Sequence, residues 1–337
     1  MSAPRGRFAP SPTGDLHLGS ALAALAAWAS VRRAGGTLVY RVEDIDGPRA
    51  VLGAAERQMA DLRWLGLDWD EGPDVGGPHA PYRQSERDAV YEAALARLAE
   101  AGRLFPCRRS RRDLLALASA PHGPEGLPPY PAAWRPRALP PDWYARRPPD
   151  AALRFRVDAP AVVVEDRVFG PVEEDVRETV GDFVLRRRDG VYAYQLAVVA
   201  DDLAMGVTEV VRGADLLAST ARQVLLIGAL GGRAPSYAHV PLLVDAAGEK
   251  LSKRHGSLRV GALREAGWSP EAVVGWLAWA LGQQDAPAPR APRAVAAAWD
   301  WARVRPAPIR VPEALAGPEA PAGPEALAAR PGGTGAV

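Results

Sequence analysis

Two lysines stand three residues apart in a chain that otherwise uses arginine as its basic residue. Lys250 and Lys253 lie in "GEKLSKRHGS" and are the only lysines, although lysine and arginine together number 41. A lysine ammonium is a compact point charge, whereas an arginine guanidinium is a broad planar fork. A transferring phosphate in a tight site can require the compact charge. The pair therefore indicates phosphate chemistry, and chance spacing is the alternative.

A second candidate for phosphate binding is "APSPTGDLHLGS" near the N-terminus. Its small residues and turn formers let backbone N–H groups approach an anion closely. A helix that begins at about Gly19 would add the positive end of its dipole. His17 lies at this junction and can donate a hydrogen bond to a phosphate oxygen. An ordinary turn between a strand and a helix, with an incidental histidine, is the alternative.

Arginines are concentrated in the middle of the chain. Between Arg103 and Arg156 there are eleven arginines and four acids, although the whole chain has a net charge of only +1. Such a cluster suggests a polyanionic partner such as nucleic acid. A solvated surface loop in an arginine-biased protein explains the cluster equally well.

An alternation of strands and helices must position these residues. The first part reads as strand, loop and helix up to Arg33, and then as the strand "TLVYRVED", which ends in acids. Helical spacing follows in residues 53–69 and 85–104. After residue 190 the pattern resumes with helices around "YQLAVVADDLAMG" and "LASTARQVLLIGALG" and with the strands "TEVVRG" and "HVPLLVD". This order predicts a mainly parallel α/β sheet.

The composition excludes several classes of protein. No apolar run approaches the roughly 18 residues that span a bilayer. The first ten residues lack the apolar core of a signal peptide. A single cysteine excludes an internal disulfide framework and a zinc site with several cysteines. We therefore expect a cytoplasmic protein without a membrane partner.

The motifs together resemble a known family. "HLGS" and "KLSKR" look like the two signatures of class I aminoacyl-tRNA synthetases, whose usual forms are HIGH and KMSKS. "RFAPSPTGDLHLGS" followed by "RVEDID" is similar to the glutamyl branch. The runs from "YQLAVVADD" and from "YAHVPLLVD" are more similar still to its truncated paralogues, the glutamyl-Q tRNA(Asp) synthetases. The resemblance covers most of residues 5–257 and is weakest in the middle.

This resemblance implies a fold and a domain order. The fold would be a Rossmann-like parallel sheet with an inserted mixed subdomain and a short C-terminal helical subdomain. The helical subdomain would include a helix with Ser269 as its cap and Pro270 at its first position. We predict the first half of the catalytic domain at 1–104, the insertion at 105–190, the second half at 191–257, the helical subdomain at 258–310 and a disordered Pro/Ala-rich tail at 311–337.

The resemblance also implies an activity. Family members activate L-glutamate with ATP, with Mg²⁺ accompanying the ATP, and pass the glutamyl group from glutamyl-adenylate to the queuosine base in the anticodon of tRNA(Asp). About 80 residues follow the lysine motif, too few for the anticodon-binding domain of a full glutamyl-tRNA synthetase. The alternatives are an enzyme that charges a tRNA 3′ end, a nucleotidyltransferase and a non-catalytic tRNA-binding paralogue. We expect a monomer.

Site residues carry over by matching motif. Arg7 would pair with a carboxylate of glutamate, and Glu43 would hold its α-ammonium. A strand-end ion pair is the alternative for Glu43 and for Arg212. The glutamate site would comprise Arg7, Phe8, Ala9, Pro10, Ser11, Glu43, Tyr194 and Arg212. The ATP site would comprise His17, Gly19, Lys250 and Lys253, and Lys253 would stabilise the charge on the leaving pyrophosphate.

One departure concerns zinc. The family usually has a zinc site in the insertion, formed by a C-x-C pair and a later Tyr and Cys. Here Cys107 and Tyr130 remain, but Arg109 and Trp134 stand at the positions of the other two ligands. One thiolate and one phenol fall short of the four ligands of a structural zinc site. His122 lies nearby, but an arginine at a ligand position would repel the ion, so we expect no zinc.

Overall fold

The computed structural model describes residues 3–115, 128–159, 161–245, 247–249 and 258–311. Lys250, Lys253, His122 and nearly all of the predicted tail lie outside the described residues. Among the described residues, every helix is too short or too polar to cross a lipid bilayer.

The molecule is built on a six-stranded sheet of order β2-β1-β8-β9-β5-β6. Every neighbouring pair is parallel except β5 with β6. The predicted parallel α/β sheet is therefore confirmed. The strands are β1 (Arg5–Phe8), β2 (Thr37–Tyr40), β5 (Val162–Asp166), β6 (Gly170–Glu174), β8 (Glu209–Gly213) and β9 (Ser236–Val240).

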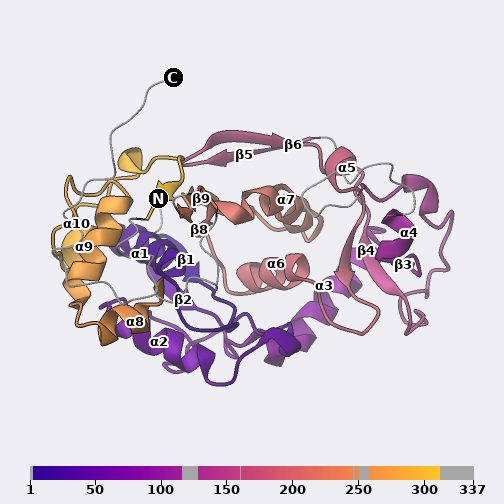
Figure 1. Cartoon of the computed structure of the whole chain (residues 1–337). Coiled ribbons are helices and arrows are strands. Elements are labelled where there is room, and N and C mark those ends of the chain that lie inside the picture. Colours follow the sequence, from indigo (N-terminus) through magenta and orange to yellow (C-terminus); the bar gives the residue numbers. More distant parts are fainter. Residues whose placement is uncertain (1–2, 116–127, 160, 246, 250–257, 312–337) are drawn as a thin grey trace.

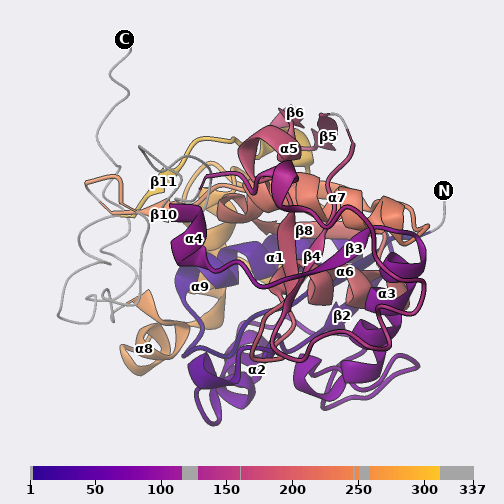
Figure 2. The same ribbon diagram turned by 90° about the vertical axis from the view of Figure 1, so that its right-hand side faces the viewer.

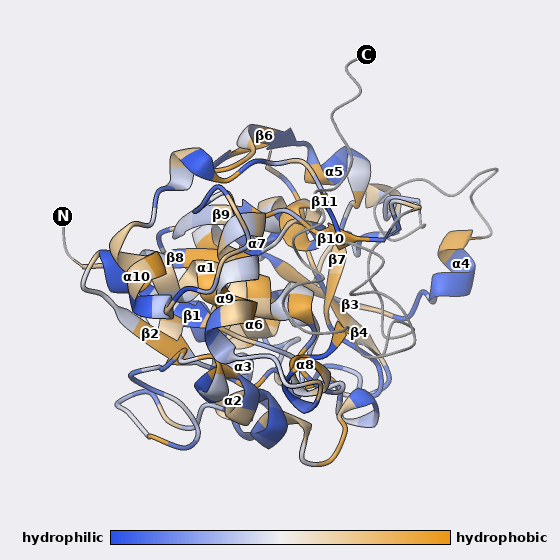
Figure 3. Ribbon diagram, turned by 60° about the vertical axis from the view of Figure 1, so that its left-hand side comes forward, coloured by the Kyte–Doolittle hydropathy of each residue, from blue (hydrophilic) through white to orange (hydrophobic). Residues whose placement is uncertain are grey.

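Helix α1 (Leu18–Arg33) lies at the centre of the larger core. Its alanine-rich middle, residues 21–31, is buried on all sides. Small side chains let it pack closely against β1 and β8 and against the C-terminal helices. Figure 3 shows apolar residues gathered in the middle of the molecule, while the peripheral α4 is part hydrophilic and part apolar. The N-terminal loop therefore leads into a rigid, buried helix.

A second core surrounds helices α6 (Tyr194–Ala204) and α7 (Thr220–Ala229), which pack against each other. Helix α3 (Asp88–Glu100) packs on α6. The remaining helices are α2 (Ala54–Trp64), α4 (Arg111–Leu115), α5 (Val176–Thr179), η1 (Gly47–Arg49), η2 (Gln84–Glu86), η3 (Ala132–Trp134), η4 (Ala214–Ser219), α8 (Val260–Glu265), α9 (Pro270–Ala280), α10 (Pro292–Ala297) and η6 (Trp301–Arg303).

The stretch predicted as an insertion divides between two sheets. Strands β3 (Leu104–Cys107), β4 (Ala152–Phe155) and β7 (Phe183–Arg186) form a small antiparallel sheet. The β5–β6 ribbon instead joins the main sheet, where Asp166 pairs with Tyr237 of β9. Figures 1 and 2 both show this ribbon along the top of the molecule, next to α7. The middle part of the predicted insertion therefore extends the main sheet, whereas its flanking strands form a sheet of their own.

The C-terminal part forms helices α8 to α10 and then returns to the main body. Ser269 caps α9 by accepting from the backbone N–H of Ala272, and Pro270 occupies the first turn. Helices α9 and α10 pack on α1, at one end of the molecule in Figure 1. The strand predicted in "HVPLLVD" is interrupted at Pro241, which lacks the N–H that a ladder requires. Its second part, β10 (Leu243–Val244), pairs in parallel with β11 (Ile309–Arg310).

Candidate active site

The sheet order places a ligand site between β1 and β8. From β1 the chain crosses through α1 to β2 on one side, whereas β8 and β9 continue the sheet on the other side. Parallel strands end at a common edge, and ligands of open α/β sheets bind where the strand order reverses. Arg7 on β1, Glu43 beyond β2 and Arg212 on β8 all lie at or near these carboxyl ends.

Arg7 is buried and held by two groups. Its Nε lies 3.5 Å from Asp202 Oδ2, and its Nη1 donates to the carbonyl of Val211 at 3.2 Å. Only 4% of Arg7 is exposed. Asp202 belongs to α6 and Val211 to β8, so two elements fix the guanidinium that β1 supplies.

Glu43 is buried beside Arg41 of the same strand extension. Its Oε1 accepts from Arg41 Nη2 at 3.1 Å, and its backbone N–H donates to the carbonyl of Pro10 at 3.0 Å. Burial raises the pKa of the Glu43 carboxyl, against the charges of Arg41 and Arg7 that lower it. The alternative of a strand-end ion pair is therefore correct in part, because Glu43 does make one. The backbone contact also brings Glu43 next to the loop of Ala9 and Pro10.

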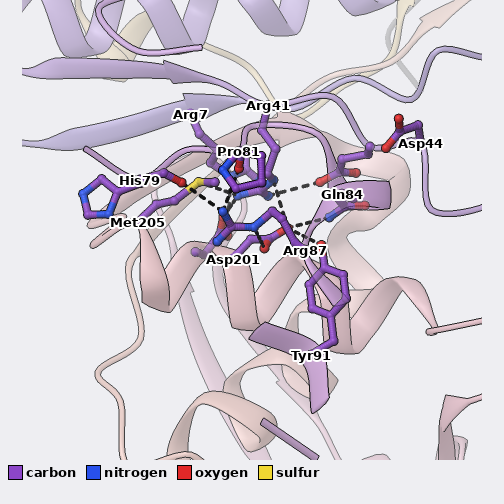
Figure 4. Close-up of polar contacts among 12 residues, drawn as sticks. Arg7, Arg41, Asp44, His79, Pro81, Gln84, Arg87, Tyr91, Asp201 and Met205 are labelled. Carbon is purple, nitrogen blue, oxygen red and sulfur yellow. Dashed lines mark hydrogen bonds and ion pairs between the residues drawn. The ribbon is translucent and has the colours of Figure 1, made fainter. Parts of the chain in front are cut away.

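Arg41 lies at the centre of a buried network of ion pairs. It is fully buried and contacts Asp202 at 2.8 Å, Asp201 at 3.6 Å and Glu43 at 3.1 Å. Figure 4 shows Gln84, Arg87 and Tyr91 converging on Asp201. Their polar atoms lie 2.9, 2.6 and 3.0 Å from its carboxylate. Through Asp201 and Arg41, the elements η2, α3 and α6 are thereby tied to Glu43 and, through Asp202, to Arg7.

Arg212 is 5% exposed and keeps one nitrogen without a partner. Its Nε donates to His239 Nε2 at 3.0 Å, and its Nη2 donates to Thr220 Oγ1 at 2.9 Å. Within the described part of the chain, the buried Nη1 has no hydrogen-bond partner. Because an unsatisfied buried cationic donor is costly, this nitrogen is where an anionic ligand fits.

Tyr194 begins α6 and lies within the electrostatic reach of the other three side chains. Burial raises the pKa of its hydroxyl, and the charges of Arg212, Glu43 and Arg7 all act on it. The structure therefore brings together Arg7, Glu43, Tyr194 and Arg212, which are more than 200 residues apart at the extremes of the sequence.

The loop after β1 forms the rim of this site. Phe8 is half-buried with its ring 6.1 Å from that of Tyr40, whereas Ser11 is exposed. Gln58 of α2 donates to the carbonyls of Ser11 and Gly14. Gly14 has a φ of 147°, which other residues rarely adopt. The loop is thus anchored to α2 and turns at Gly14.

Of the predicted phosphate site, the structure describes the part around His17 and Gly19. His17 is the N-cap residue of α1, and among the described residues a Cβ added to Gly19 would meet no atom within 4 Å. His17 forms a β-bridge with Arg259, and the N–H of Val260 donates to the carbonyl of Leu16 at 2.9 Å. Residue 259 follows the lysine motif closely, so the two signature segments are tied together. Lys250 and Lys253 themselves lie outside the described residues.

The four residues at the positions of the family's zinc ligands also lie together, but their side chains are not a set of zinc-binding donors. Cys107 Sγ lies 3.3 Å from Tyr130 Oη. The Arg109 guanidinium lies 4.8 Å from the ring centroid of Trp134, whose ring packs edge-on against Tyr130 at 5.5 Å. A cation–π pair therefore occupies the other two ligand positions, and these residues do not fit zinc. No group of three or more His, Cys, Asp or Glu that could hold a metal exists in the described ranges.

A cavity of about 1050 Å³ opens between the insertion and the α6–α7 region. Tyr194, Gln195 and Ser219 line one side, and Arg109 and Arg154 line the other. Of the predicted glutamate-site residues, Tyr194 alone lines it, so the cavity adjoins that site and does not coincide with it. Further arginines on its wall are Arg111, Arg187, Arg188 and Arg222.

Sequence reasoning missed the residues that support the site. Arg41, Asp201 and Asp202 were read only as part of "RVED" and "VADDL". Charged residues inside apolar runs were the available signal, because such residues are buried only when they are paired. Asp166 and His239 were missed because they lie 73 residues apart in the sequence, and no local pattern pairs them.

The comparisons with known proteins agree with this geometry. The family model "tRNA synthetases class I (E and Q), catalytic domain" matches residues 4–285. A protein of Symbiobacterium thermophilum named Glutamyl-Q tRNA(Asp) synthetase is 51% identical over 91% of this chain and 95% of its own length. A protein of the same name from Nitratidesulfovibrio vulgaris is 50% identical over 86% and 90%. A Glutamate–tRNA ligase of Anaeromyxobacter sp. strain K is 43% identical over 85% of this chain and 60% of its own length.

Solved structures show the same fold. A glutamate-tRNA synthetase of Elizabethkingia anophelis superposes with a TM-score of 0.79 at 28% identity, over 94% of this chain and 69% of that one. A glutamate tRNA ligase of Elizabethkingia meningosepticum, solved with its amino acid, gives the same TM-score at 29% identity, over 94% and 68%.

Proposed function

The chain belongs to the family of class I tRNA synthetases for glutamate and glutamine, and on that premise we propose that it activates L-glutamate with ATP and transfers the glutamyl group to the queuosine base in the anticodon of tRNA(Asp). Family membership makes the chain a ligase-type enzyme. The name shared by the relatives at 50 and 51% identity supports the choice of acceptor.

The observation that carries this proposal is the convergence of two guanidiniums and one carboxylate at the switch point of the sheet. Arg7 and the unpartnered Nη1 of Arg212 would take the two carboxylates of glutamate. Glu43 would take the α-ammonium, and Tyr194 would close the pocket. These charges complement an amino acid with two negative groups and one positive group.

The reaction then needs positioning and charge stabilisation. A carboxylate oxygen of glutamate attacks the α-phosphorus of ATP, and pyrophosphate leaves. A nucleophile of the acceptor next attacks the carbonyl carbon of glutamyl-adenylate, and AMP leaves. His17 and the N-terminus of α1 would bind phosphate oxygens, and Lys253 would stabilise the leaving pyrophosphate. No covalent enzyme intermediate is required.

Mg²⁺ would enter with ATP. It usually keeps several waters and is held by one or two carboxylates together with substrate phosphates. The absence of a preformed cluster of three ligands in the described ranges is consistent with that mode. We propose that the reaction takes place in the cytoplasm, where ATP and tRNA are present, and the monomeric state stays a prediction.

The cavity beside Tyr194 supports a nucleic-acid acceptor. Its volume of about 1050 Å³ exceeds that of a nucleoside, and arginines line its wall. Arginine is suited both to phosphate pairing and to stacking on bases. The acceptor would reach the glutamyl-adenylate from this side.

Two measurements test the proposal. Glutamate-dependent exchange between ATP and pyrophosphate should occur in wild-type protein and should fall sharply in Arg212→Lys. Labelled glutamate should be transferred to tRNA(Asp) that lacks its 3′ adenosine, and only when queuosine is present. No exchange by well-folded protein would favour a non-catalytic paralogue.

A second candidate function is charging of a tRNA 3′ end. The 43% identity to the Anaeromyxobacter protein named Glutamate–tRNA ligase favours it. In that case intact tRNA would accept glutamate with or without queuosine, and removal of the 3′ adenosine would abolish acceptance.

A further inference from the structure

An aspartate and a histidine lie directly behind Arg212. His239 of β9 is fully buried, and Asp166 at the end of β5 is 4% exposed. Strand β9 pairs with β8, and the register places His239 opposite Arg212. Figure 1 shows β8 and β9 side by side. The main sheet therefore carries a row of three polar side chains, Asp166, His239 and Arg212, on neighbouring strands.

The hydrogen bonds of this row fix the tautomer of His239. Asp166 accepts from the backbone N–H groups of Val168 and Phe169 at 2.9 and 3.0 Å, as an ionised carboxylate does. Its Oδ2 lies 2.6 Å from His239 Nδ1. On the other side, Arg212 Nε can only donate, so His239 Nε2 must accept. The imidazole is therefore neutral and carries its proton on Nδ1.

The electrostatic environment favours the same state. Burial lowers the pKa of His239, and the charges of Arg212 and Arg7 add to that effect, against the hydrogen bond to Asp166. For Asp166, burial acts to raise its pKa, but the hydrogen bonds from His239 and the backbone hold the pKa below its usual range. A neutral imidazole beside an ionised carboxylate results.

This arrangement holds two of the three guanidinium nitrogens of Arg212. His239 holds its Nε, and Thr220 holds its Nη2 at 2.9 Å. The plane of the guanidinium is thereby fixed, and the buried Nη1 remains without a partner in the part of the chain that is described. Fixing a guanidinium in advance reduces the entropy lost when it binds an anion.

We propose that Asp166 and His239 are positioning residues, which hold Arg212 for a carboxylate of the substrate, and that protonation of His239 Nε2 releases Arg212 and weakens substrate binding. A proton on Nε2 would face the Nε–H of Arg212 and add a second cation beside the guanidinium. The proposal rests on the proposed function, in which Arg212 binds glutamate.

The groups that face His239 come from five elements. They are Asp166 on β5, Arg212 on β8, Arg7 on β1, Tyr237 on β9 and Thr220 on α7. Tyr237 stacks on the imidazole with centroids 6.2 Å apart, and Thr220 Oγ1 lies 3.3 Å from Nε2. Of the side chains in direct contact with Arg212 in the described part of the chain, His239 alone is an imidazole, the group whose ordinary pKa of about 6.5 lies nearest to neutral pH.

The sign of the pH dependence follows from the lowered pKa of His239. Above the ordinary histidine value of about 6.5 the imidazole is neutral and glutamate binding is constant. As the pH falls below that value and through the lowered pKa, Arg212 is released and the KM for glutamate rises. The KM should rise more than kcat falls, because Arg212 binds the ground state as well.

The test compares three variants in glutamate-dependent exchange between pH 5 and 8, with thermal melting as the check on folding. His239→Ala should raise the KM for glutamate about 10- to 100-fold, the effect of losing one charge-assisted hydrogen bond. His239→Gln keeps an acceptor for Arg212 without a titrating group, so it should retain most of the affinity and lose the acidic rise in KM. Tyr237→Phe keeps the stacked ring and serves as the matched control.

Wild-type KM and a wild-type pH profile in folded His239→Ala and His239→Gln would overturn the proposal, even if Arg212→Lys still impairs the enzyme. Absence of exchange in the wild-type protein at every pH would instead overturn the proposed function. Calorimetric binding of L-glutamate then decides about His239 separately: affinity that falls below about pH 6.5 in wild type but not in His239→Gln supports the proposal, and pH-independent affinity overturns it.

Discussion

Arg41 would not contact a ligand, but it holds two side chains that would. It contacts Glu43 directly and reaches Arg7 through Asp202. With Arg7 and Arg87 it supplies three guanidiniums to the three carboxylates of Glu43, Asp201 and Asp202. Charges buried in this way are tolerated only when they balance, because removing one partner leaves the others desolvated. The buried network therefore stabilises the fold and also holds the side chains of the candidate site in place.

We predict that Arg41→Met lowers the free energy of unfolding by about 3–5 kcal/mol, the cost of breaking a buried ion pair. Urea denaturation at neutral pH measures the change. Arg32→Met is the matched control, because Arg32 pairs with the more exposed Asp68 and Asp70 and should lose about 1 kcal/mol or less. Equal losses in the two variants would contradict the assigned role of Arg41.

Glu43→Gln separates the ligand role of Glu43 from its structural role. The amide oxygen can still accept from Arg41, which is 3.1 Å from Glu43 Oε1, so the free energy of unfolding should fall less than in Arg41→Met, although one charge of the buried network is lost. The KM for glutamate should rise about 10- to 100-fold, because a charge-assisted contact to the α-ammonium is lost. Steady-state exchange kinetics measures this, and an unchanged KM would show that Glu43 is only a strand-end partner of Arg41.

At the scale of elements, the first turn of α1 would bind ATP phosphates through its backbone. A Cβ at Gly19 would meet no atom of the described residues within 4 Å, so no described side chain fills the space over this turn. We predict that Gly19→Ala raises the KM for ATP several-fold and slightly raises the melting temperature, because alanine favours a helix by about 1 kcal/mol. Poorer folding, or an unchanged KM for ATP, would contradict the prediction.

The small antiparallel sheet shows how an element can keep the arrangement of a metal site without the ligands. Besides the Arg109–Trp134 pair, the guanidinium of Arg154 lies 4.3 Å from the ring centroid of Tyr130. Each such contact stabilises by about 0.5–2 kcal/mol. Packing of this kind can fix the element without zinc.

We predict that purified protein contains no stoichiometric zinc and that a chelator leaves its melting temperature unchanged. Trp134→Ala should lower the melting temperature, because the cation–π pair with Arg109 is lost. Elemental analysis and thermal melting check the two results. Stoichiometric zinc, or unfolding by the chelator, would contradict them.

At the scale of the whole molecule, the last described strand returns to the segment that precedes the lysine motif. Strand β11 pairs with β10, and the N–H of Val311 donates to the carbonyl of Val244 at 2.9 Å. Since β10 leads towards the lysine motif, the C-terminal segment supports the strand that precedes it. Helices α9 and α10 pack on α1 and so support the helix that follows the proposed phosphate-binding loop.

We predict that ending the chain after Arg305, which removes β11, reduces the exchange reaction at least tenfold because β10 loses its partner. Ending it after Val311 removes only the predicted disordered tail and should leave exchange and melting temperature unchanged. The two truncations form a matched pair. Equal activity in both would show that β11 has no role in positioning the lysine motif.

The sequence alone determined the strand and helix order, because apolar periodicity and turn residues are local properties. It also determined the candidate ligands Arg7, Glu43, Tyr194 and Arg212, because they lie in long motifs. Only the tertiary structure decided that the β5–β6 ribbon joins the main sheet and that Asp166 and His239 lie behind Arg212. Pairing between strands that are distant in the sequence depends on the packing of the whole core, and no local pattern encodes it.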